Sequence, residues 1–333
     1  MISFVVDFNK TNPKAAQRFL NAMPTFIPQL KQAELLFVVS HHNQSVLKAI
    51  SRFLQQQPQL KVKLVFCAKT LAFNQQLYYA LQQATKAYIW FLDPQSKLDE
   101  DKTTALFKFL KTHAVDIVEF QPKLSGISKW MPPQRLPLES WLTYDLATQK
   151  EIVAYTFPFF GNKVFARIIL EQIFQKELIS LRMDASSNLA FELCYLAFLE
   201  AKSYLWIKEP VVSFYVAEDC LPTFHYVLSQ WKRIHNQYKE QGRYLPEIIY
   251  ANVYYLMVIL TGFYGYQKLN LIFKDHTWMR KRYYETLLKI QQNDMQAFSQ
   301  ENPYMHQTSP ETNLLKAVLP INKWNKIFNL LSG

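Results

Sequence analysis

Few residues in this sequence have the type and the spacing that catalysis or metal binding requires. Asp93 is one candidate. It lies in the run FLDPQS, where an apolar segment ends and Pro94 follows. A carboxylate at such a place either faces a ligand or caps a turn before the proline. His41 and His42 are a second candidate, because imidazole is a common metal ligand. Adjacent histidines without a spaced partner are a weak metal signal, which favours two exposed loop histidines.

Glycine and cysteine usage excludes several classes of site. The chain has six glycines in 333 residues and the first is Gly126. Neither a P-loop nor a GxGxxG motif can therefore occur in the first 125 residues. The three cysteines, Cys67, Cys194 and Cys220, form no disulfide framework and no zinc knuckle, which indicates a reducing compartment. Cys67 and Cys194 lie in apolar surroundings, so we expect both in the core.

The charge balance favours anionic partners of several kinds. Lysine and arginine outnumber aspartate and glutamate by 37 to 26, a net charge of +11, and no block of like charge indicates a specific nucleic-acid arm. Nucleotide diphosphates, anionic lipid surfaces and RNA all suit a diffuse positive charge. The run WMRKRYY at Trp278–Tyr284 is the best candidate for contact with an anionic membrane surface, and a solvated helix face is the alternative.

Apolar segments and helical patterns alternate over the first 120 residues. Helix starts are indicated by Asn12 before Pro13, by Asn43 and by the acidic residues Asp99–Asp101, and a further helix is expected over 72–84. This alternation predicts an α/β fold with a mostly parallel, Rossmann-like sheet. The expected strands are Ile2–Val6, Leu35–Val39, Val62–Cys67, Tyr88–Leu92 and Ile117–Phe120.

Ligands of parallel sheets bind beyond the carboxyl ends of the strands. The residues that follow the expected strands are therefore the candidate site. These are Asp7–Asn9, Ser40–Asn43, Lys69–Asn74 and Asp93–Ser96.

The rest of the chain changes character twice. Five prolines make residues 122–160 an irregular connection, which carries Trp130 and Trp141. The pattern is helical over 162–200, and helices rich in tyrosine, tryptophan and lysine are expected from about residue 221. The uncharged run Ile248–Gln267 is long enough to span a membrane, but its five tyrosines favour a buried or interfacial helix.

The order of several short motifs resembles family 2 glycosyltransferases, the nucleotide-sugar enzymes with a GT-A fold. ISFVVDFN places Phe8-Asn9 where that family has Tyr-Asn, and LLFVVSHHN takes the place of its second strand and acidic turn. Ala72-Phe73-Asn74 stands for its Ala-Arg-Asn motif and FLDPQS for its Phe-Leu-Asp-x-Asp-Asp motif. GNKVF at Gly161–Phe165 and EPVVSFYV at Glu209–Val216 resemble two later segments, so the resemblance covers about residues 1–217.

Three departures from the family pattern concern the residues that carry its chemistry. Ser40 and His41 replace the acid that recognises the uracil or ribose end of the donor. Asp93 is kept, but Gln95 replaces the second acid of the pair that holds Mg²⁺ or Mn²⁺ against the diphosphate, and an amide brings no negative charge. In the run MDASSNLAF, Ser187 or Asn188 falls near the place of the family's catalytic base, and Asp184 is the one carboxylate close by, with a plain loop carboxylate as the alternative.

The resemblance implies a GT-A domain over 1–125, its acceptor-side part over 126–217 and a helical region over 218–333. It implies transfer of a sugar from a nucleotide diphosphate sugar to a lipid, protein or glycan hydroxyl. Asp7 and Asn9, with Ser40 and His41, would line the nucleotide pocket. Asn74 would lie near the diphosphate, and a solvated helix residue is the alternative for it.

Two alternatives to an active enzyme remain open. The chain can be an inactive GT-A-fold scaffold at a membrane surface, or a protein that binds RNA or lipid through its charge. The start MISFVVDFNK has no basic n-region, so we expect a cytoplasmic protein that can bind the inner face of the membrane.

Overall fold

The computed structural model describes most of the chain, and it divides into two compact units. Unit 1 comprises Met1–Gln149 and Phe157–Cys220, and unit 2 comprises Lys150–Thr156 and Leu221–Gly333. The described residues are 1–9, 11–26, 33–40, 43–68, 71–126, 129–181, 189–216, 224–260, 262 and 301–318.

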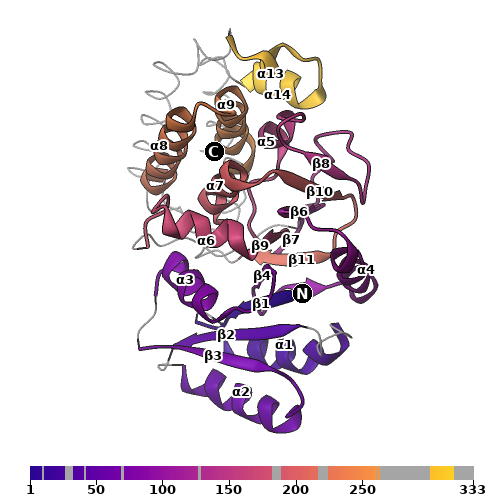
Figure 1. Cartoon of the computed structure of the whole chain (residues 1–333), viewed down its shortest axis with the longest axis vertical. Coiled ribbons are helices and arrows are strands. Elements are labelled where there is room, and N and C mark those ends of the chain that lie inside the picture. The colour runs from indigo at the N-terminus through magenta and orange to yellow at the C-terminus, as the bar shows by residue number, and fades with distance from the viewer. Residues whose placement is uncertain are drawn as a thin grey trace, which may run out of the picture. The chain divides into compact units, whose positions relative to one another are not determined.

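Unit 1 is built on an eight-stranded sheet with the order β3-β2-β1-β4-β9-β6-β10-β8 (Figure 1). β1 to β4 are parallel to one another, and β6 is parallel to β10. β9 runs antiparallel between β4 and β6, and β8 runs antiparallel at the edge beside β10. The strands are β1 (Ile2–Asp7), β2 (Glu34–Ser40), β3 (Val62–Cys67), β4 (Tyr88–Leu92), β6 (Ile117–Phe120), β8 (Thr143–Asp145), β9 (Lys163–Ala166) and β10 (Ser203–Ile207).

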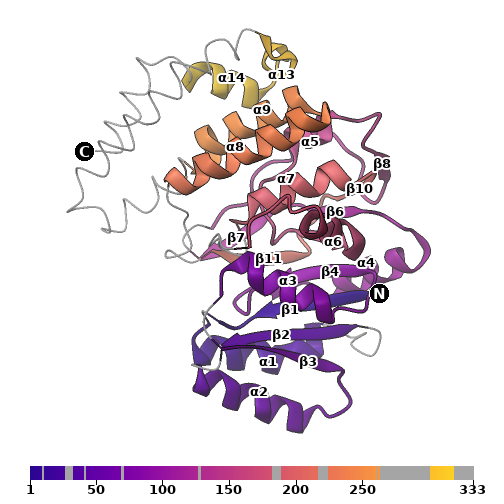
Figure 2. The ribbon, with the colours of Figure 1, turned by 60° about the vertical axis from the view of Figure 1, so that its left-hand side comes forward.

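The helices of the first half cover both faces of this sheet, which explains why β1, β2 and β4 are nearly continuous apolar runs. α1 (Pro13–Phe26) and α2 (Gln44–Gln56) lie side by side, and α3 (Phe73–Gln83) returns the chain from β3 to β4 across the other face (Figure 2). α4 (Glu100–Thr112) precedes β6. The five expected strands and the four intervening helices are confirmed to within two residues at almost every end that was predicted.

The predicted helix starts are confirmed by their capping hydrogen bonds. Asn12 Oδ1 accepts from the Ala15 amide at 2.9 Å, Asn43 Oδ1 from the Val46 amide at 3.4 Å, and Asp99 Oδ1 from the Lys102 amide at 3.1 Å. Each cap satisfies a backbone donor that the first helical turn leaves without a partner.

The prediction for residues 122–200 is wrong in part. The connection 122–160 contains β7 (Lys123–Gly126), β8 and α5 (Glu151–Tyr155), and Lys163–Ala166 forms β9 where a helical pattern was expected. These elements are three to five residues long, so they depend on partners far away in sequence. α6 (Arg167–Gln175) and α7 (Phe191–Glu200) confirm the helical pattern after β9.

A second sheet of three strands has the order β5-β11-β7, with β5 at Lys97–Leu98 and β11 at Val212–Val216. β7 ends at Gly126, whose φ of +101° is a conformation that favours glycine. A Cβ atom at this position would collide with the carbonyl oxygen of Val216 and with the ring of Tyr215. Gly126 therefore lets β7 lie close against the end of β11.

Unit 2 is helical in its described part. It contains α5, α8 (Phe224–Gln241), α9 (Leu245–Tyr254), the π-helix η4 (Tyr255–Leu260), α13 (Pro303–His306) and α14 (Pro310–Val318). Three tyrosines join these elements: the ring centroids of Tyr155 and Tyr250 lie 5.2 Å apart, and Tyr304 lies 5.9 and 5.7 Å from them. Their hydroxyls donate to Gln307, Glu311 and Glu247 respectively.

Ile248–Leu260 lies in α9 and η4 and is mostly buried, as expected for a packed helix. No helix in the described part combines the length and the apolar character needed to cross a membrane. The rest of Ile248–Gln267, apart from residue 262, lies outside the described residues, as does all of Trp278–Tyr284.

Candidate functional site

The carboxyl ends of β1 to β4 bring several of the predicted site residues to one edge of the sheet. Asp7 and Ser40 are the last residues of β1 and β2, Cys67 is the last of β3, and Asp93 directly follows β4. The register pairs Val6 with Leu92 and Ser40 with Cys67, so these residues end their strands at neighbouring positions. The chain therefore has a polar sheet edge where α/β proteins bind ligands.

The turn after β1 is organised by the Asp7 carboxylate. Asp7 Oδ1 accepts hydrogen bonds from the backbone and the side-chain amides of Asn9, both at 2.9 Å. The Thr11 hydroxyl donates to the Asp7 carbonyl, and Asn43 Nδ2 donates to the Thr11 carbonyl, which ties this turn to the start of α2. Asn9 Oδ1 is buried and accepts no hydrogen bond from any described residue.

The turn after β4 is organised by Asp93. Its carboxylate accepts from the Gln95 amide at 2.7 Å, and its carbonyl accepts from the Ser96 amide at 2.8 Å. The turn-capping interpretation of Asp93 is thus confirmed. Burial of the carboxyl group, aided by the negative charge of Asp7 and opposed by the Gln95 amide, raises the pKa of Asp93 to about 7.

Cys67 lies at the same edge, but its surroundings do not favour the thiolate form that a nucleophile needs. Burial, together with the negative charge of Asp7, raises the pKa of its thiol, so the thiolate is disfavoured. Cys67 and Cys194 are both free and buried, as the apolar surroundings predicted.

Asn74 lies in the first turn of α3 and is 1% exposed. Its side-chain nitrogen donates to the Ser180 carbonyl at 2.9 Å. This bond links α3 to the segment that precedes Asp184. His41 and Asp184, two further predicted site residues, lie outside the described residues.

The residues at this edge fit a hard divalent cation. Asp93 and Gln95 offer carboxylate and amide oxygens directly after β4, Asp7 ends the adjacent strand β1, and Asn9 Oδ1 is buried and accepts no hydrogen bond from a described residue. Oxygen donors of this kind are the ligands that Mg²⁺ and Mn²⁺ take, together with oxygens of a bound phosphate. No cluster of three or more His, Cys, Asp or Glu side chains occurs in the described part of the chain, so such an ion would need ligands from elsewhere.

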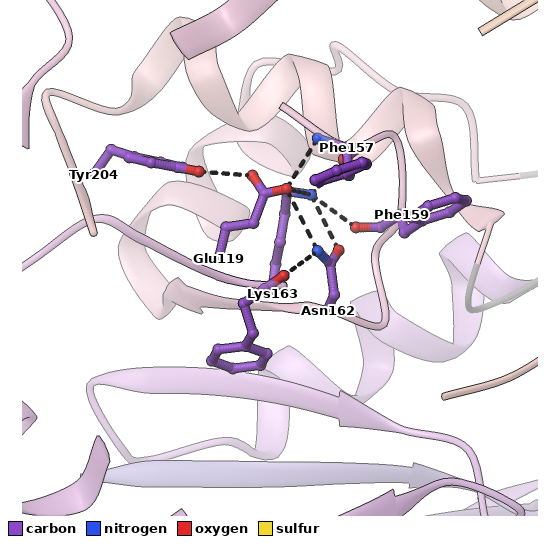
Figure 3. Close-up of polar contacts among 7 residues, drawn as sticks. Glu119, Phe157, Phe159, Asn162, Lys163 and Tyr204 are labelled. Atoms are coloured by element: carbon purple, nitrogen blue, oxygen red, sulfur yellow. Dashed lines mark hydrogen bonds and ion pairs between the residues drawn. The ribbon is translucent and has the colours of Figure 1, made fainter. Parts of the chain in front are cut away.

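A second polar group lies inside unit 1 and was missed by the sequence analysis. It consists of Glu119 on β6, Asn162 and Lys163 at the start of β9, and Tyr204 on β10, and we refer to it as the Glu119–Lys163 cluster (Figure 3). The side chains of Glu119 and Lys163 are both 0% exposed, and Lys163 Nζ lies 3.3 Å from Glu119 Oε1. The Tyr204 hydroxyl donates to Glu119 Oε2 at 3.0 Å.

This cluster also holds the loop that precedes β9. Glu119 Oε1 accepts from the Phe157 amide at 2.9 Å, while Lys163 Nζ donates to the carbonyls of Phe157 and Phe159. Asn162 Nδ2 donates to the Phe120 carbonyl at 2.7 Å. A glutamate within the apolar run IVEF and a lysine before the apolar run VFA were the available signals, because charges in buried strands require partners.

The sequence matches no protein-family model and no curated protein. Solved structures nevertheless share its architecture. TarS 1–349 from S. aureus in complex with UDP-GlcNAc has a TM-score of 0.63 at 14% sequence identity, covering 99% of this chain and 89% of that one. The mannosyltransferase PcManGT from Pyrobaculum calidifontis, in complex with GDP-Man and Mn²⁺, has a TM-score of 0.50 at 15% identity, covering 98% and 87%. Together with the mixed α/β architecture and the mostly parallel sheet, this likeness shows that the chain has the GT-A fold of glycosyltransferases.

Proposed function

We propose that this protein transfers a sugar from a nucleotide diphosphate sugar to a hydroxyl group of a lipid, protein or glycan, as a divergent relative of family 2 glycosyltransferases. The observation that carries the proposal is the pair of carboxylates, Asp7 and Asp93, at the carboxyl ends of adjacent strands in a GT-A fold. The similar structures are described in complex with UDP-GlcNAc and with GDP-Man and Mn²⁺, which supports a nucleotide sugar as ligand.

In this scheme the turn after β1 receives the nucleotide. Asp7 and Asn9 line the pocket for its base and ribose, with Ser40, the last residue of β2, and His41, which follows it in the sequence. Asn74 keeps α3 in place near the diphosphate through its bond to the Ser180 carbonyl. Asp184 is the proposed base that takes the proton from the acceptor hydroxyl.

Asp93 and Gln95 are the proposed metal ligands. A bound Mg²⁺ or Mn²⁺ would supply charge neutralisation of the diphosphate leaving group. The chain's own contribution is the tight turn after β4, in which the Gln95 amide holds one oxygen of the Asp93 carboxylate. Since Gln95 adds no charge, we expect weaker metal binding than a pair of carboxylates would give.

Calorimetric titration with UDP-GlcNAc and with GDP-mannose, each with and without Mn²⁺, tests this proposal. We expect binding that requires Mn²⁺ and is lost in Asp93→Ala, but retained in Asp101→Ala. Asp101 is an exposed acid on α4, so the control removes the same charge away from the site. Absence of binding to any UDP- or GDP-sugar, or binding that Asp93→Ala leaves intact, would contradict the proposed site.

A scaffold without catalysis is the second candidate, and Gln95 in place of an acid favours it. Loss of a metal-binding charge is expected to reduce the rate by orders of magnitude. If the protein is a scaffold, its effect in cells will survive Asp93→Ala. Flotation with anionic vesicles tests whether it also binds a membrane surface, the further partner proposed from its net charge of +11.

A further inference from the structure

We infer that the Glu119–Lys163 cluster is a positioning device for the sheet edge, which it controls through the loop Phe157–Phe160. The predicted effect on nucleotide-sugar binding rests on the proposed function. The predicted effect on the sheet edge rests on packing alone. Both Glu119 and Lys163 are positioning residues, because neither lies at the carboxyl ends of β1 and β4.

Burying the charges of Glu119 and Lys163 costs folding free energy, which raises the question of what the pair provides that an apolar pair would not. Removing two charges from water carries a large desolvation penalty, and an apolar pair of similar volume is often at least as stable. What an apolar pair lacks is hydrogen bonding to the loop. Lys163 donates to the carbonyls of Phe157 and Phe159, and Glu119 accepts from the Phe157 amide. The cluster thus hydrogen-bonds to backbone donors and acceptors of two loop residues, Phe157 and Phe159 (Figure 3).

The loop in turn packs against the elements that carry the candidate site. The ring centroid of Phe160 lies 5.6 Å from that of Phe73 and 6.0 Å from that of Phe91, and Phe73 and Phe91 lie 4.7 Å apart. Phe73 directly precedes Asn74, and Phe91 precedes Asp93 by two residues. All three rings are buried, so a shift of the loop must displace them or open a void.

A charge-balanced double variant separates positioning from stability. Lys163→Met and Glu119→Gln each leave one buried partner unsatisfied, so each alone should lower the melting temperature strongly. Combined, they restore charge balance but leave the carbonyls of Phe157 and Phe159 without the lysine donor. We expect the double variant to recover part of the melting temperature and to bind the nucleotide sugar with Mn²⁺ at least tenfold more weakly than the unmodified protein.

Hydrogen exchange tests the inference independently of any ligand. In the double variant, peptides that contain Phe73–Asn74 and Phe91–Asp93 should exchange at least tenfold faster than in the unmodified protein. Phe160→Leu should do the same, since it removes the ring that joins the loop to both elements and leaves the charges in place. Phe107→Leu is the matched control: Phe107 is 1% exposed on α4 and its ring lies against Phe4.

Faster exchange confined to the loop and β9, or an effect no larger than that of Phe107→Leu, overturns the inference. If the double variant does not fold, Tyr204→Phe, which removes only the hydroxyl that donates to Glu119, tests the cluster with the same two readouts, and an unchanged sheet edge overturns the inference. If the unmodified protein binds no nucleotide sugar, the proposed function fails, and the exchange measurement still decides whether the cluster positions the sheet edge.

Discussion

Asp7 and Asp93 stand at the carboxyl ends of two adjacent parallel strands, since Asp7 ends β1, Asp93 directly follows β4, and the residues before them, Val6 and Leu92, are paired. Each carboxylate also accepts a backbone amide two residues further along the chain, from Asn9 and Gln95 respectively. The turns after β1 and β4 therefore share one hydrogen-bond pattern, in which an aspartate carboxylate accepts the backbone amide two residues later. A negative charge on Asp7 disfavours ionisation of Asp93, so the two carboxyl groups are coupled in their protonation.

The pKa of Asp93 predicts how stability depends on pH. Because this pKa is raised from 3.8 to about 7, the folded protein binds more protons than the unfolded chain between these values. Stability from this group is therefore fully present below about pH 4 and is lost as the pH rises through about 7. Asp93→Asn, which keeps an acceptor for the Gln95 amide, should raise the free energy of unfolding at pH 8 by a few kcal/mol at most, since one pKa unit corresponds to about 1.4 kcal/mol.

The gain from Asp93→Asn should shrink toward zero at about pH 4, where Asp93 is also neutral. Urea unfolding at pH 4.5, 6 and 8 measures this, with Asp101→Asn as the exposed control. A gain that is equal at all three pH values would show that charge is not its cause.

Gln95→Asp should strengthen metal-dependent binding of the nucleotide sugar. The substitution adds a carboxylate two residues after Asp93, which supplies the charge that a hard cation favours. We expect about tenfold tighter binding in the presence of Mn²⁺ and no gain without it, measured by calorimetry. Gln82→Asp, on the exposed face of α3, makes the same change in net charge and should have no effect. Equal gains in the two variants would indicate a long-range charge effect.

Glu34 should be one of the larger single contributors to the stability of unit 1. Burial opposes its ionisation, but hydrogen bonds from Lys63, the Thr85 amide and hydroxyl, and the Ser3 hydroxyl lower its pKa to about 2. The resulting stability is present above about pH 4.5 and is lost as the pH falls toward 2. Glu34→Gln should cost about 1–3 kcal/mol at pH 7, less than the full pKa shift would give, because the Lys63 partner is partly exposed and screened by solvent. Thermal unfolding against pH measures it, and Glu139→Gln is the exposed control; a cost that persists unchanged at pH 2.5 would contradict this account.

Gly126→Ala should destabilise the three-stranded sheet. A side chain there is strained by the φ of +101° and meets the Val216 carbonyl and the Tyr215 ring. Strain of this kind costs about 1–3 kcal/mol, and the collision adds to it. Gly242→Ala is a matched control, because Gly242 has a φ of +63° but open space around it, and it should cost only about 1 kcal/mol. Equal losses of melting temperature in the two variants would mean that the close approach of β7 to β11 is unimportant.

The N-terminal half of the fold follows from local sequence signals. Runs such as Ile2–Val6 and Tyr88–Leu92 are long, apolar and β-branched or aromatic, and caps such as Asn43 mark where helices start. β9 carries no comparable signal, since Lys163–Ala166 becomes a strand only between β4 and β6. Its four residues have no periodicity that would distinguish strand from helix.

The candidate site was predictable in position and less so in detail. Asp7 and Asp93 were found because they follow recognisable strands. The use of Asn74 to bind the Ser180 carbonyl depends on a contact between residues 106 positions apart in the chain, which no local pattern indicates. The pairing of Glu119 with Lys163 is of the same kind, although two charges in apolar strands indicate that each needs a partner.

The place of α5 in the chain has a consequence for how the protein is made. This helix belongs to unit 2, yet it is synthesised in the middle of unit 1, and its Tyr155 packs on Tyr250 and Tyr304. About 90 residues separate α5 from α9, so at about 5–20 residues per second α9 is synthesised roughly 5–20 s after α5. During that interval unit 1 folds while α5 is already part of the chain. α5 ends two residues before Phe157, whose amide donates to Glu119. Co-translational folding of the two units is therefore interleaved, and a chain released before α9 is made would lack the contacts of Tyr155 with Tyr250 and Tyr304.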